Sequence, residues 1–192
     1  MKKLYVISGC NGAGKTTASY TVLPDILNCR EFVNADEIAK GLSPFNPASM
    51  RIDAGRLMVE RIEDLLAEDA DFAIETTLAT RTYAKLIQRA HERGYFVTLV
   101  YFWLESADLA VERVKLRVRE GGHDIPEEDI RRRYDRGIMN FFNLYKPICD
   151  NWIFVDNSVP PFRLIATGSR DEIISLNDPL LFNKLQCYGM RQ

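Results

Sequence analysis

Short apolar runs alternate with longer amphipathic stretches along most of this 192-residue chain. The runs are almost continuously apolar and end at glycine or polar residues, a pattern typical of strands buried on both faces of a sheet. We predict strands at residues 4–8, 31–34, 72–75, 95–102 and 152–156. Because helical stretches follow the strands, the order predicts an α/β fold with a parallel five-stranded sheet flanked by helices.

The amphipathic stretches predict the helices, which we place at residues 15–23, 47–68, 79–93, 106–120 and 126–145. Pro24 should end the first helix. Asn46 and Pro47 should begin the second as N-cap and first-turn proline. The side of this helix that is expected to be buried carries Met50, Ala54, Leu57, Met58, Ile62, Leu65 and Leu66.

Residues 160–192 do not continue the alternation. Two short apolar runs flank Thr167-Gly168-Ser169, which predicts a short hairpin with its turn at these three residues, followed by a final helix. No linker or change of composition divides the chain, so we expect residues 1–192 to form one domain. Within it, residues 106–145 form a candidate helical lid that carries arginines, and residues 160–192 a C-terminal appendage.

Glycine and hydroxyl residues gather after the first predicted strand, in the segment SGCNGAGKTT. Gly9, Gly14, Lys15 and Thr16 match the P-loop spacing G-x-x-x-x-G-K-[ST], between a strand and a helix. Glycines let successive N–H groups point at phosphate oxygens, and the next helix directs its N-terminal dipole to the same anion. The residues expected to bind ATP here are Gly9, Asn11, Gly12, Ala13, Gly14, Lys15, Thr16 and Thr17.

Lys15 and Thr16 carry the specific chemistry of this loop. The Lys15 ammonium should reach the β- and γ-phosphates, and the Thr16 hydroxyl should ligate Mg²⁺, so ATP and Mg²⁺ are the expected cofactors. A GTPase is disfavoured because the chain has no N/T-K-x-D segment, and an ABC- or AAA-type ATPase because the strand ending at Glu75 lacks an Asp-Glu pair. The predicted fold is therefore that of a P-loop NTPase, and the small size and late arginine cluster favour a kinase of the compact nucleoside-monophosphate-kinase architecture.

Polar residues follow three predicted strands at the sheet edge where ligands bind in open α/β folds. Asp36 can accept the proton of a substrate hydroxyl as that oxygen attacks the γ-phosphorus, or can cap the next helix. Glu75 and Thr77 can orient a metal-bound water or contact the acceptor, or a threonine can cap a helix. Arg81 faces the same cleft or lies in solvent. Asn157 contacts adenine or shapes its turn.

Arginines are densest in the candidate lid. Phosphoryl transfer needs charge neutralisation at the moving phosphoryl group, so we expect at least one of Arg117, Arg119 and Arg133 to contact the ATP phosphates. Each could instead pair with a nearby carboxylate at the surface. Gly121-Gly122 and the following His123 form a candidate hinge, where His123 is a phosphate contact or a loop residue.

Charge and composition exclude several classes of protein. The formal net charge is −2, so no basic excess attracts nucleic acid. No apolar stretch approaches the ~20 residues of a membrane span, and the first apolar run is too short for a secretory signal. Cys10, Cys29, Cys149 and Cys187 show no paired or metal-binding spacing. We therefore expect a cytoplasmic protein with no nucleic-acid or membrane partner.

Together these segments resemble the zeta-toxin family of P-loop kinases, in particular its short stand-alone members. The resemblance runs from Leu4 to about Ser158. Besides the P-loop it rests on Asn34-Ala35-Asp36, on Glu75-Thr76-Thr77-Leu78, on RVREGGHDIP at residues 117–126, and on Asp156-Asn157-Ser158.

This resemblance implies a phosphotransferase that acts on an alcohol group, a hydroxyl of UDP-N-acetylglucosamine. It implies Asp36 as the base, Lys15 and lid arginines on the phosphates, Glu75 and Thr77 at the acceptor, and a helical antitoxin that covers the ATP site. Well-studied toxins carry Glu-Gly-Thr-Leu-Arg where this chain has ETTLA, with its arginine two places later at Arg81. A lid arginine of the toxins falls near His123. A kinase of another hydroxylated metabolite, or an ATPase switch that controls a protein, therefore remains an alternative.

Overall fold

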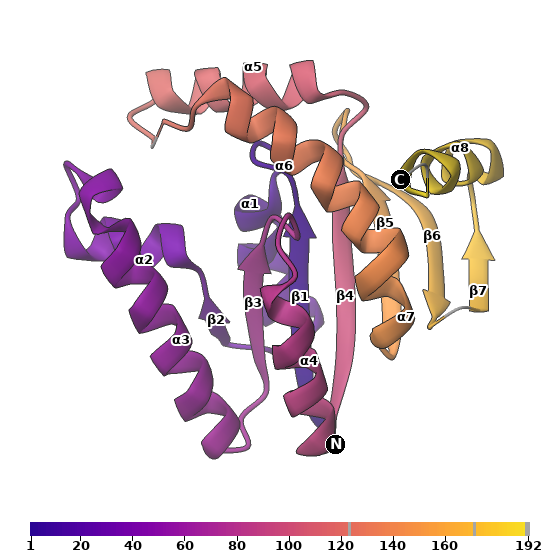
Figure 1. Cartoon of the computed structure of the whole chain (residues 1–192), viewed down its shortest axis with the longest axis horizontal. Coiled ribbons are helices and arrows are strands. Elements are labelled where there is room, and N and C mark those ends of the chain that lie inside the picture. The colour runs from indigo at the N-terminus through magenta and orange to yellow at the C-terminus, as the bar shows by residue number, and fades with distance from the viewer. Residues whose placement is uncertain (123, 171, 191–192) are drawn as a thin grey trace.

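The computed structural model describes residues 1–122, 124–170 and 172–190, which form one mixed sheet covered by helices (Figure 1). Its strands are β1 (Lys2–Gly9), β2 (Glu31–Val33), β3 (Phe72–Thr76), β4 (Tyr95–Trp103), β5 (Asn151–Asp156), β6 (Arg163–Ser169) and β7 (Glu172–Leu176). The strand order is β2-β3-β1-β4-β5-β6-β7. Strands β1 to β5 are parallel, and β6 pairs in the antiparallel direction with β5 on one side and with β7 on the other. The α/β class is confirmed. The prediction of five strands was wrong, because the C-terminal hairpin extends the sheet to seven.

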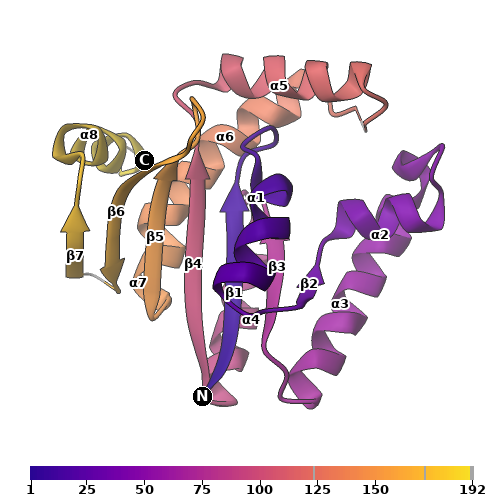
Figure 2. The same ribbon diagram turned by 180° about the vertical axis from the view of Figure 1, so that it is seen from behind.

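The helices cover both faces of this sheet. They are α1 (Lys15–Thr21), α2 (Ala35–Leu42), α3 (Arg51–Ala67), α4 (Thr82–Glu92), α5 (Ala107–Arg119), α6 (Glu127–Asn140), α7 (Lys146–Ile148) and α8 (Pro179–Gly189). The face seen in Figure 1 is covered by α4, α6 and α7, and the opposite face by α1 (Figure 2). The α2 and α3 helices stand beside β2, while α5 lies across the carboxyl ends of the parallel strands. Of the candidate lid, α5 therefore lies above the edge of the sheet that carries the P-loop, and α6 covers one face.

Two helices deviate from the predicted boundaries, each near a proline. The chain passes Pro24 in a π turn, Val22–Ile26, that directly continues α1. A 3₁₀ turn, Pro47–Met50, precedes α3, and Asn46 makes no side-chain cap. Leu57, expected on the buried side, is 37% exposed, and Met50, also expected there, lies in the 3₁₀ turn and is only partly buried, whereas Ala54, Met58, Ile62, Leu65 and Leu66 are buried as predicted.

The loop between β3 and α4 has a fixed shape that the sequence pattern did not predict. The helix expected from residue 79 begins at Thr82. Leu78 adopts a left-handed φ of 59°, which an α-helix does not contain, and its N–H donates to Thr76 Oγ1 at 3.0 Å. The helix expected over residues 126–145 is also interrupted, because α6 passes into a π turn at Phe141–Tyr145.

An aromatic cluster packs α8 and the hairpin against the sheet. Phe182 of α8 is fully buried and stacks on Trp152 of β5, with ring centroids 5.6 Å apart. The predicted hairpin is confirmed, but its predicted turn residues belong to β6. A Cβ at Gly168 would lie 2.2 Å from Cζ2 of Trp152 and 2.1 Å from Glu172 O. Glycine is therefore required at this position by close packing rather than by a turn.

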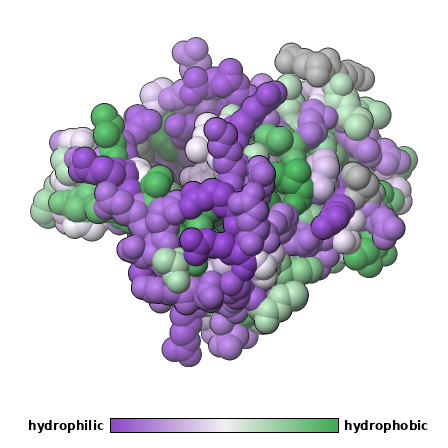
Figure 3. Space-filling model, turned by 60° about the horizontal axis from the view of Figure 1, so that its bottom comes forward, coloured by the Kyte–Doolittle hydropathy of each residue, from purple (hydrophilic) through white to green (hydrophobic). Residues whose placement is uncertain are grey.

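The face of the molecule drawn in Figure 3 is mainly polar. Figure 3 shows hydrophilic side chains over most of the displayed face, with apolar patches toward its two sides. Among the described residues, no helix is both long and apolar enough to cross a membrane. All four cysteines are unpaired. Burial raises the pKa of Cys10, inside the P-loop, to about 11, so its thiol stays protonated at neutral pH.

Asp150 joins β4, β5 and α4 at the edge of the sheet opposite the P-loop. Its carboxylate accepts a hydrogen bond from Val97 N at 2.8 Å and lies 2.9 Å from His91 Nε2. His91 of α4 is therefore paired with Asp150. Partial burial works to raise the pKa of Asp150, but these hydrogen bonds outweigh it, and the pKa is lowered from its ordinary value.

Replacing Asp150 with asparagine should make the stability less sensitive to acid. Because the pKa of Asp150 is lowered in the folded state, its contribution is fully present above about pH 4 and is lost as the pH falls through the folded pKa. We expect Asp150→Asn to cost about 1–3 kcal/mol at pH 7 and to flatten the decline of unfolding free energy in acid, measured by urea unfolding. Asp53→Asn, on the exposed face of α3, is the control. An unchanged acid profile in Asp150→Asn would contradict this role.

Candidate active site

The P-loop bends the backbone tightly between β1 and α1. Gly9 has a φ of 139°, and a Cβ there would lie 2.2 Å from Phe102 O on the neighbouring β4. Gly12 and Gly14 each have a φ of 79°, and Ala13 N donates to the carbonyl of Cys10 at 3.2 Å. Left-handed residues in such a turn direct successive N–H groups to one side, the geometry of an anion-binding nest.

Lys15, Thr16 and Glu75 form a compact polar group behind this loop. Lys15 is buried; its Nζ donates to Cys10 O at 3.0 Å and lies 3.6 Å from Glu75 Oε1. Thr16 Oγ1 donates to Glu75 Oε2 at 2.8 Å. These contacts form because β1 and β3 are adjacent, so that the residue at the end of β3 reaches the first turn of α1. Glu75 therefore lies on the P-loop side of the site.

The loop after β5 supports the P-loop. Asn157 Nδ2 donates to Ala13 O at 2.8 Å, and a Cβ at Gly14 would lie 2.5 Å from the same nitrogen. Asp156 Oδ1 accepts a hydrogen bond from Ser158 N at 2.9 Å, which forms an Asx turn. Asn157 thus shapes this loop, and a contact between Asn157 and adenine stays a prediction.

Asp36 lies in the first turn of α2 with its carboxylate available for other contacts. The N-cap is Asn34, whose Oδ1 accepts hydrogen bonds from Asp36 N at 2.8 Å and Glu37 N at 3.4 Å. The interpretation of Asp36 as the helix cap was therefore wrong. Within the described part of the chain, the Asp36 carboxylate makes no hydrogen bond or ion pair.

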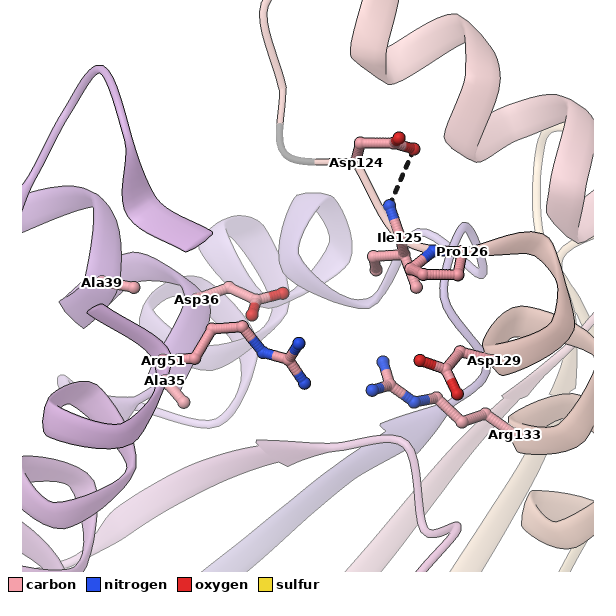
Figure 4. Close-up of a pocket in the computed structure, with 9 residues that line it drawn as sticks. All are labelled: Ala35, Asp36, Ala39, Arg51, Asp124, Ile125, Pro126, Asp129 and Arg133. Carbon is pink, nitrogen blue, oxygen red and sulfur yellow. Dashed lines mark hydrogen bonds between the residues drawn. The ribbon is translucent and has the colours of Figure 1, made fainter. Parts of the chain in front are cut away.

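Asp36 lines two cavities. One, of about 490 Å³, is called the P-loop cavity here; it lies between the starts of α1 and α2, and Thr16 and Thr17 are the P-loop motif residues that line it, together with Arg117. The Asp36 cavity, of about 150 Å³, is bounded by Arg51 at the start of α3 and by Arg133 of the lid helix α6. In Figure 4 the guanidinium groups of Arg51 and Arg133 point toward one another across this cavity, with the Asp36 carboxylate beside them. A hydroxyl group bound in the Asp36 cavity would thus lie beside a carboxylate that also borders the cavity at Thr16.

The predicted lid arginines differ in position. Arg133 Nη1 donates to Asn11 Oδ1 at 3.1 Å, which links α6 directly to the P-loop. Burial lowers the pKa of Arg133 despite the attraction of nearby carboxylates, but the guanidinium stays charged at any physiological pH. Arg117 lines the P-loop cavity, whereas Arg119 is exposed. His123 lies outside the described residues.

A third cavity, of about 460 Å³, lies at the carboxyl end of β3 and is called the arginine–threonine pocket here. Its charged and hydroxyl lining comes mainly from Arg132, Arg133, Arg136, Thr76, Thr77 and Thr80. Thr77 lines this pocket, whereas Arg81 is exposed and does not; an acceptor contact of Thr77 stays a prediction.

Two arginines of these cavities, Arg51 and Arg136, were missed from the sequence. Arg51 lies in no motif, and its place at the cavity depends on how α3 packs. Arg136 lies three residues after Arg133 on α6, a spacing that places both side chains on one helix face. That spacing is a signal that could have identified Arg136.

The family model for zeta toxin matches residues 1–144. The chain belongs to the zeta-toxin family. An uncharacterized protein of Haemophilus influenzae is 31% identical over 140 residues, which are 69% of this chain and 98% of that protein.

Solved structures show the same fold. AvrRxo1-ORF1, in a structure with AvrRxo1-ORF2 and ATP, matches with a TM-score of 0.75 and 18% identity over 97% of this chain and 64% of that chain. The PezAT chromosomal toxin–antitoxin system of Streptococcus pneumoniae matches with a TM-score of 0.65 and 13% identity, over 98% and 84%. This chain therefore spans less than two thirds of AvrRxo1-ORF1. The likeness shows that this zeta-toxin family member has a P-loop kinase fold.

Five of the predicted residues gather around the P-loop of this zeta-toxin family member: Asn11, Lys15, Thr16, Glu75 and Arg133. Asp36 and Arg117 line the cavity in front of it, and Thr77 lies in the arginine–threonine pocket. The structure does not bring Arg81 or Arg119 to this group, since neither residue lines any of these three cavities. The chemical roles of all these residues stay predictions.

Proposed function

We propose that the protein transfers the γ-phosphate of ATP to a hydroxyl group of a small acceptor. The observation that carries this proposal is the position of Asp36, whose side chain lines both the P-loop cavity and the Asp36 cavity. A hydroxyl bound in the Asp36 cavity would lie next to a potential general base and beside a nucleotide held in the P-loop. Holding both reactants in this way is a large part of the catalysis of phosphoryl transfer.

In the proposed reaction, the acceptor oxygen attacks the γ-phosphorus while its proton passes to the Asp36 carboxylate. A bond forms between this oxygen and phosphorus, and the bond from phosphorus to the β–γ bridging oxygen breaks, so that ADP leaves with the electron pair. Lys15 would neutralise charge on the β- and γ-phosphates. Arg133, held in place by Asn11, would do so from the lid side.

The residues around Thr16 fit an Mg²⁺ ion. Thr16 Oγ1 and Glu75 Oε2 lie 2.8 Å apart beside the P-loop, and both are oxygen ligands of the kind that Mg²⁺ prefers. When bound with ATP, Mg²⁺ supplies positive charge to the phosphate oxygens. Thr16 would hold the ion through its hydroxyl, and Glu75 would orient its water ligands while keeping Lys15 in position.

We propose a sugar nucleotide such as UDP-N-acetylglucosamine as the acceptor. Membership of the zeta-toxin family supports this choice, as does the place of Thr77 beside Arg133. The ETTLA segment, which departs from the toxin pattern, supports another hydroxylated metabolite as the second candidate. We also propose a helical protein partner that covers the ATP site, because AvrRxo1-ORF1 was solved with AvrRxo1-ORF2 and PezAT is a toxin–antitoxin system.

Incubation of the purified protein with ATP, Mg²⁺ and UDP-N-acetylglucosamine should yield a sugar nucleotide with one added phosphate, detected by mass spectrometry. ATP consumption should depend on the acceptor. Lys15→Met should abolish the product, and Lys85→Met, an exposed lysine of α4, should not. ATP consumption that ignores the sugar nucleotide, with no change of mass, would exclude this acceptor. No acceptor-dependent ATP consumption with any hydroxylated metabolite would contradict the kinase proposal.

A further inference from the structure

The arginine–threonine pocket concentrates positive charge without a counter-charge of its own. Three arginines of α6, Arg132, Arg133 and Arg136, line it, and none of its lining residues is acidic. Arg132 pairs with Asp129, which lines the neighbouring Asp36 cavity rather than this pocket. Arg136 makes no ion pair within the described part of the chain. Like charges three and four residues apart on a helix repel one another, so this arrangement favours a bound anion.

Hydroxyl groups complete the lining of the pocket. Thr76, Thr77 and Thr80 face the three arginines from the β3–α4 loop. Hydroxyl donors and guanidinium groups are the side chains that recognise phosphate, because they donate several hydrogen bonds to its oxygens. A phosphate or diphosphate group therefore matches the pocket better than a neutral sugar does.

Both walls of the pocket are held in fixed positions. The α6 helix passes the end of β3 at Gly137, where a Cβ would lie 2.9 Å from Thr77 O. Asn140 Nδ2 donates to Leu78 O at 2.7 Å, and Tyr145 Oη donates to Thr80 O at 2.6 Å. These bonds tie the helix that carries the arginines to the loop that carries the threonines. A site on two such walls is organised before a ligand binds.

The pocket is placed to act on the acceptor rather than on ATP. Arg133 lines both this pocket and the Asp36 cavity, so a molecule with its hydroxyl at Asp36 can extend into the pocket. Arg136 lies almost one helical turn beyond Arg133, which is the residue that contacts Asn11 of the P-loop. The two ends of such an acceptor would be bound separately: the hydroxyl by Asp36 and the anionic group by Arg136.

We propose that the arginine–threonine pocket binds a phosphate or diphosphate group of the acceptor and that Arg136 determines this specificity. The role in an acceptor rests on the proposed kinase function, whereas the binding of the anion can be tested without it. The substrate class is then a hydroxylated metabolite that already carries phosphate, and neutral sugars or nucleosides are poor acceptors.

The test is calorimetric titration of pyrophosphate into protein whose P-loop is saturated with Mg²⁺ and a non-hydrolysable ATP analogue. We expect binding that weakens at least tenfold in Arg136→Met. Arg131→Met is the matched control, because Arg131 lies on the same helix but pairs with Glu127 and Asp108 away from the pocket. Thermal unfolding should be the same for both variants. Absence of pyrophosphate binding, or equal binding by Arg136→Met and wild type, would overturn the proposal.

Titration of UDP under the same conditions distinguishes an acceptor-borne diphosphate from a free inorganic ion. Binding of UDP that is at least as tight as that of pyrophosphate, and equally sensitive to Arg136→Met, supports the acceptor assignment. Binding of pyrophosphate without UDP would overturn it. A protein that binds these anions but phosphorylates no acceptor would contradict the kinase function and leave the anion site standing.

Discussion

Asp36→Asn should lower the rate of phosphoryl transfer by roughly 10²–10⁴-fold while ATP binds as tightly as before. Asparagine has nearly the same shape as aspartate but cannot accept the proton of the attacking hydroxyl. The helix itself should be unaffected, because the cap is the Asn34 side chain and its main bond goes to the backbone N–H of residue 36. The effect should therefore appear in kcat, measured from product formation at saturating ATP and acceptor.

The matched control for this substitution is Asp53→Asn. Asp53 is on the neighbouring helix α3, where it pairs with Arg56 at the surface. Its loss should change the rate by less than twofold, since exposed pairs contribute only about 0–1 kcal/mol even to stability. ATP affinity, measured by calorimetry, should be equal in both variants. Transfer retained by Asp36→Asn would contradict the base assignment, and turnover of ATP without an acceptor would favour the ATPase switch.

The P-loop could be predicted residue by residue because its geometry is local. The glycines, Lys15 and Thr16 occupy one continuous segment, and their spacing already contains the backbone shape that holds a phosphate. Asp36 could be located as well, since carboxyl ends of parallel strands meet at one edge. The interpretation of Asp36 as the helix N-cap was wrong for a local reason that the sequence contains: Asn34 precedes Asp36 and is an equally good cap residue.

Arg51 and Arg136 could not be predicted with the same certainty, because tertiary packing determines where their helices lie. The close approach of α6 to the β3–α4 loop at Gly137 places Arg136 in the arginine–threonine pocket. For Arg81 the sequence allowed either the cleft or solvent. The left-handed Leu78 precedes a helix that begins only at Thr82, and Arg81 is exposed.

The hairpin shows a similar limit. Two apolar runs around Gly168 correctly indicated antiparallel strands, but the pattern does not say whether a hairpin extends the main sheet. That depends on Phe154 and Trp152 of β5, whose partners β6 and α8 come later in the chain. The pattern predicts a turn at Gly168. In the structure Gly168 lies within β6, and the Trp152 ring fills the space that a side chain would need. Sequence spacing cannot distinguish these two uses of glycine.

Phe182→Ala should lower the free energy of unfolding by about 3–5 kcal/mol, because it removes a fully buried ring at the centre of this aromatic cluster. Phe182 lies 5.6 Å from Trp152, 5.4 Å from Phe142 and 6.0 Å from Phe154, measured between ring centroids. These neighbours belong to β5 and to the π turn after α6, so the cavity would open between α8 and the sheet. A loss of this size is a large part of the total of about 5–15 kcal/mol that is typical of a folded protein.

Leu180→Ala on the same helix is the control for this substitution, because Leu180 is 86% exposed. It should change the unfolding free energy by less than about 0.5 kcal/mol. In urea unfolding, Phe182→Ala should lower the midpoint of one cooperative transition without changing its slope. A small loss, or a separate early transition, would mean that α8 detaches on its own. The link between the two helices is the hydrogen bond from Tyr188 of α8 to Asp135 of α6. If α8 detached, α6 would keep Arg133 and Arg136 in place without this link.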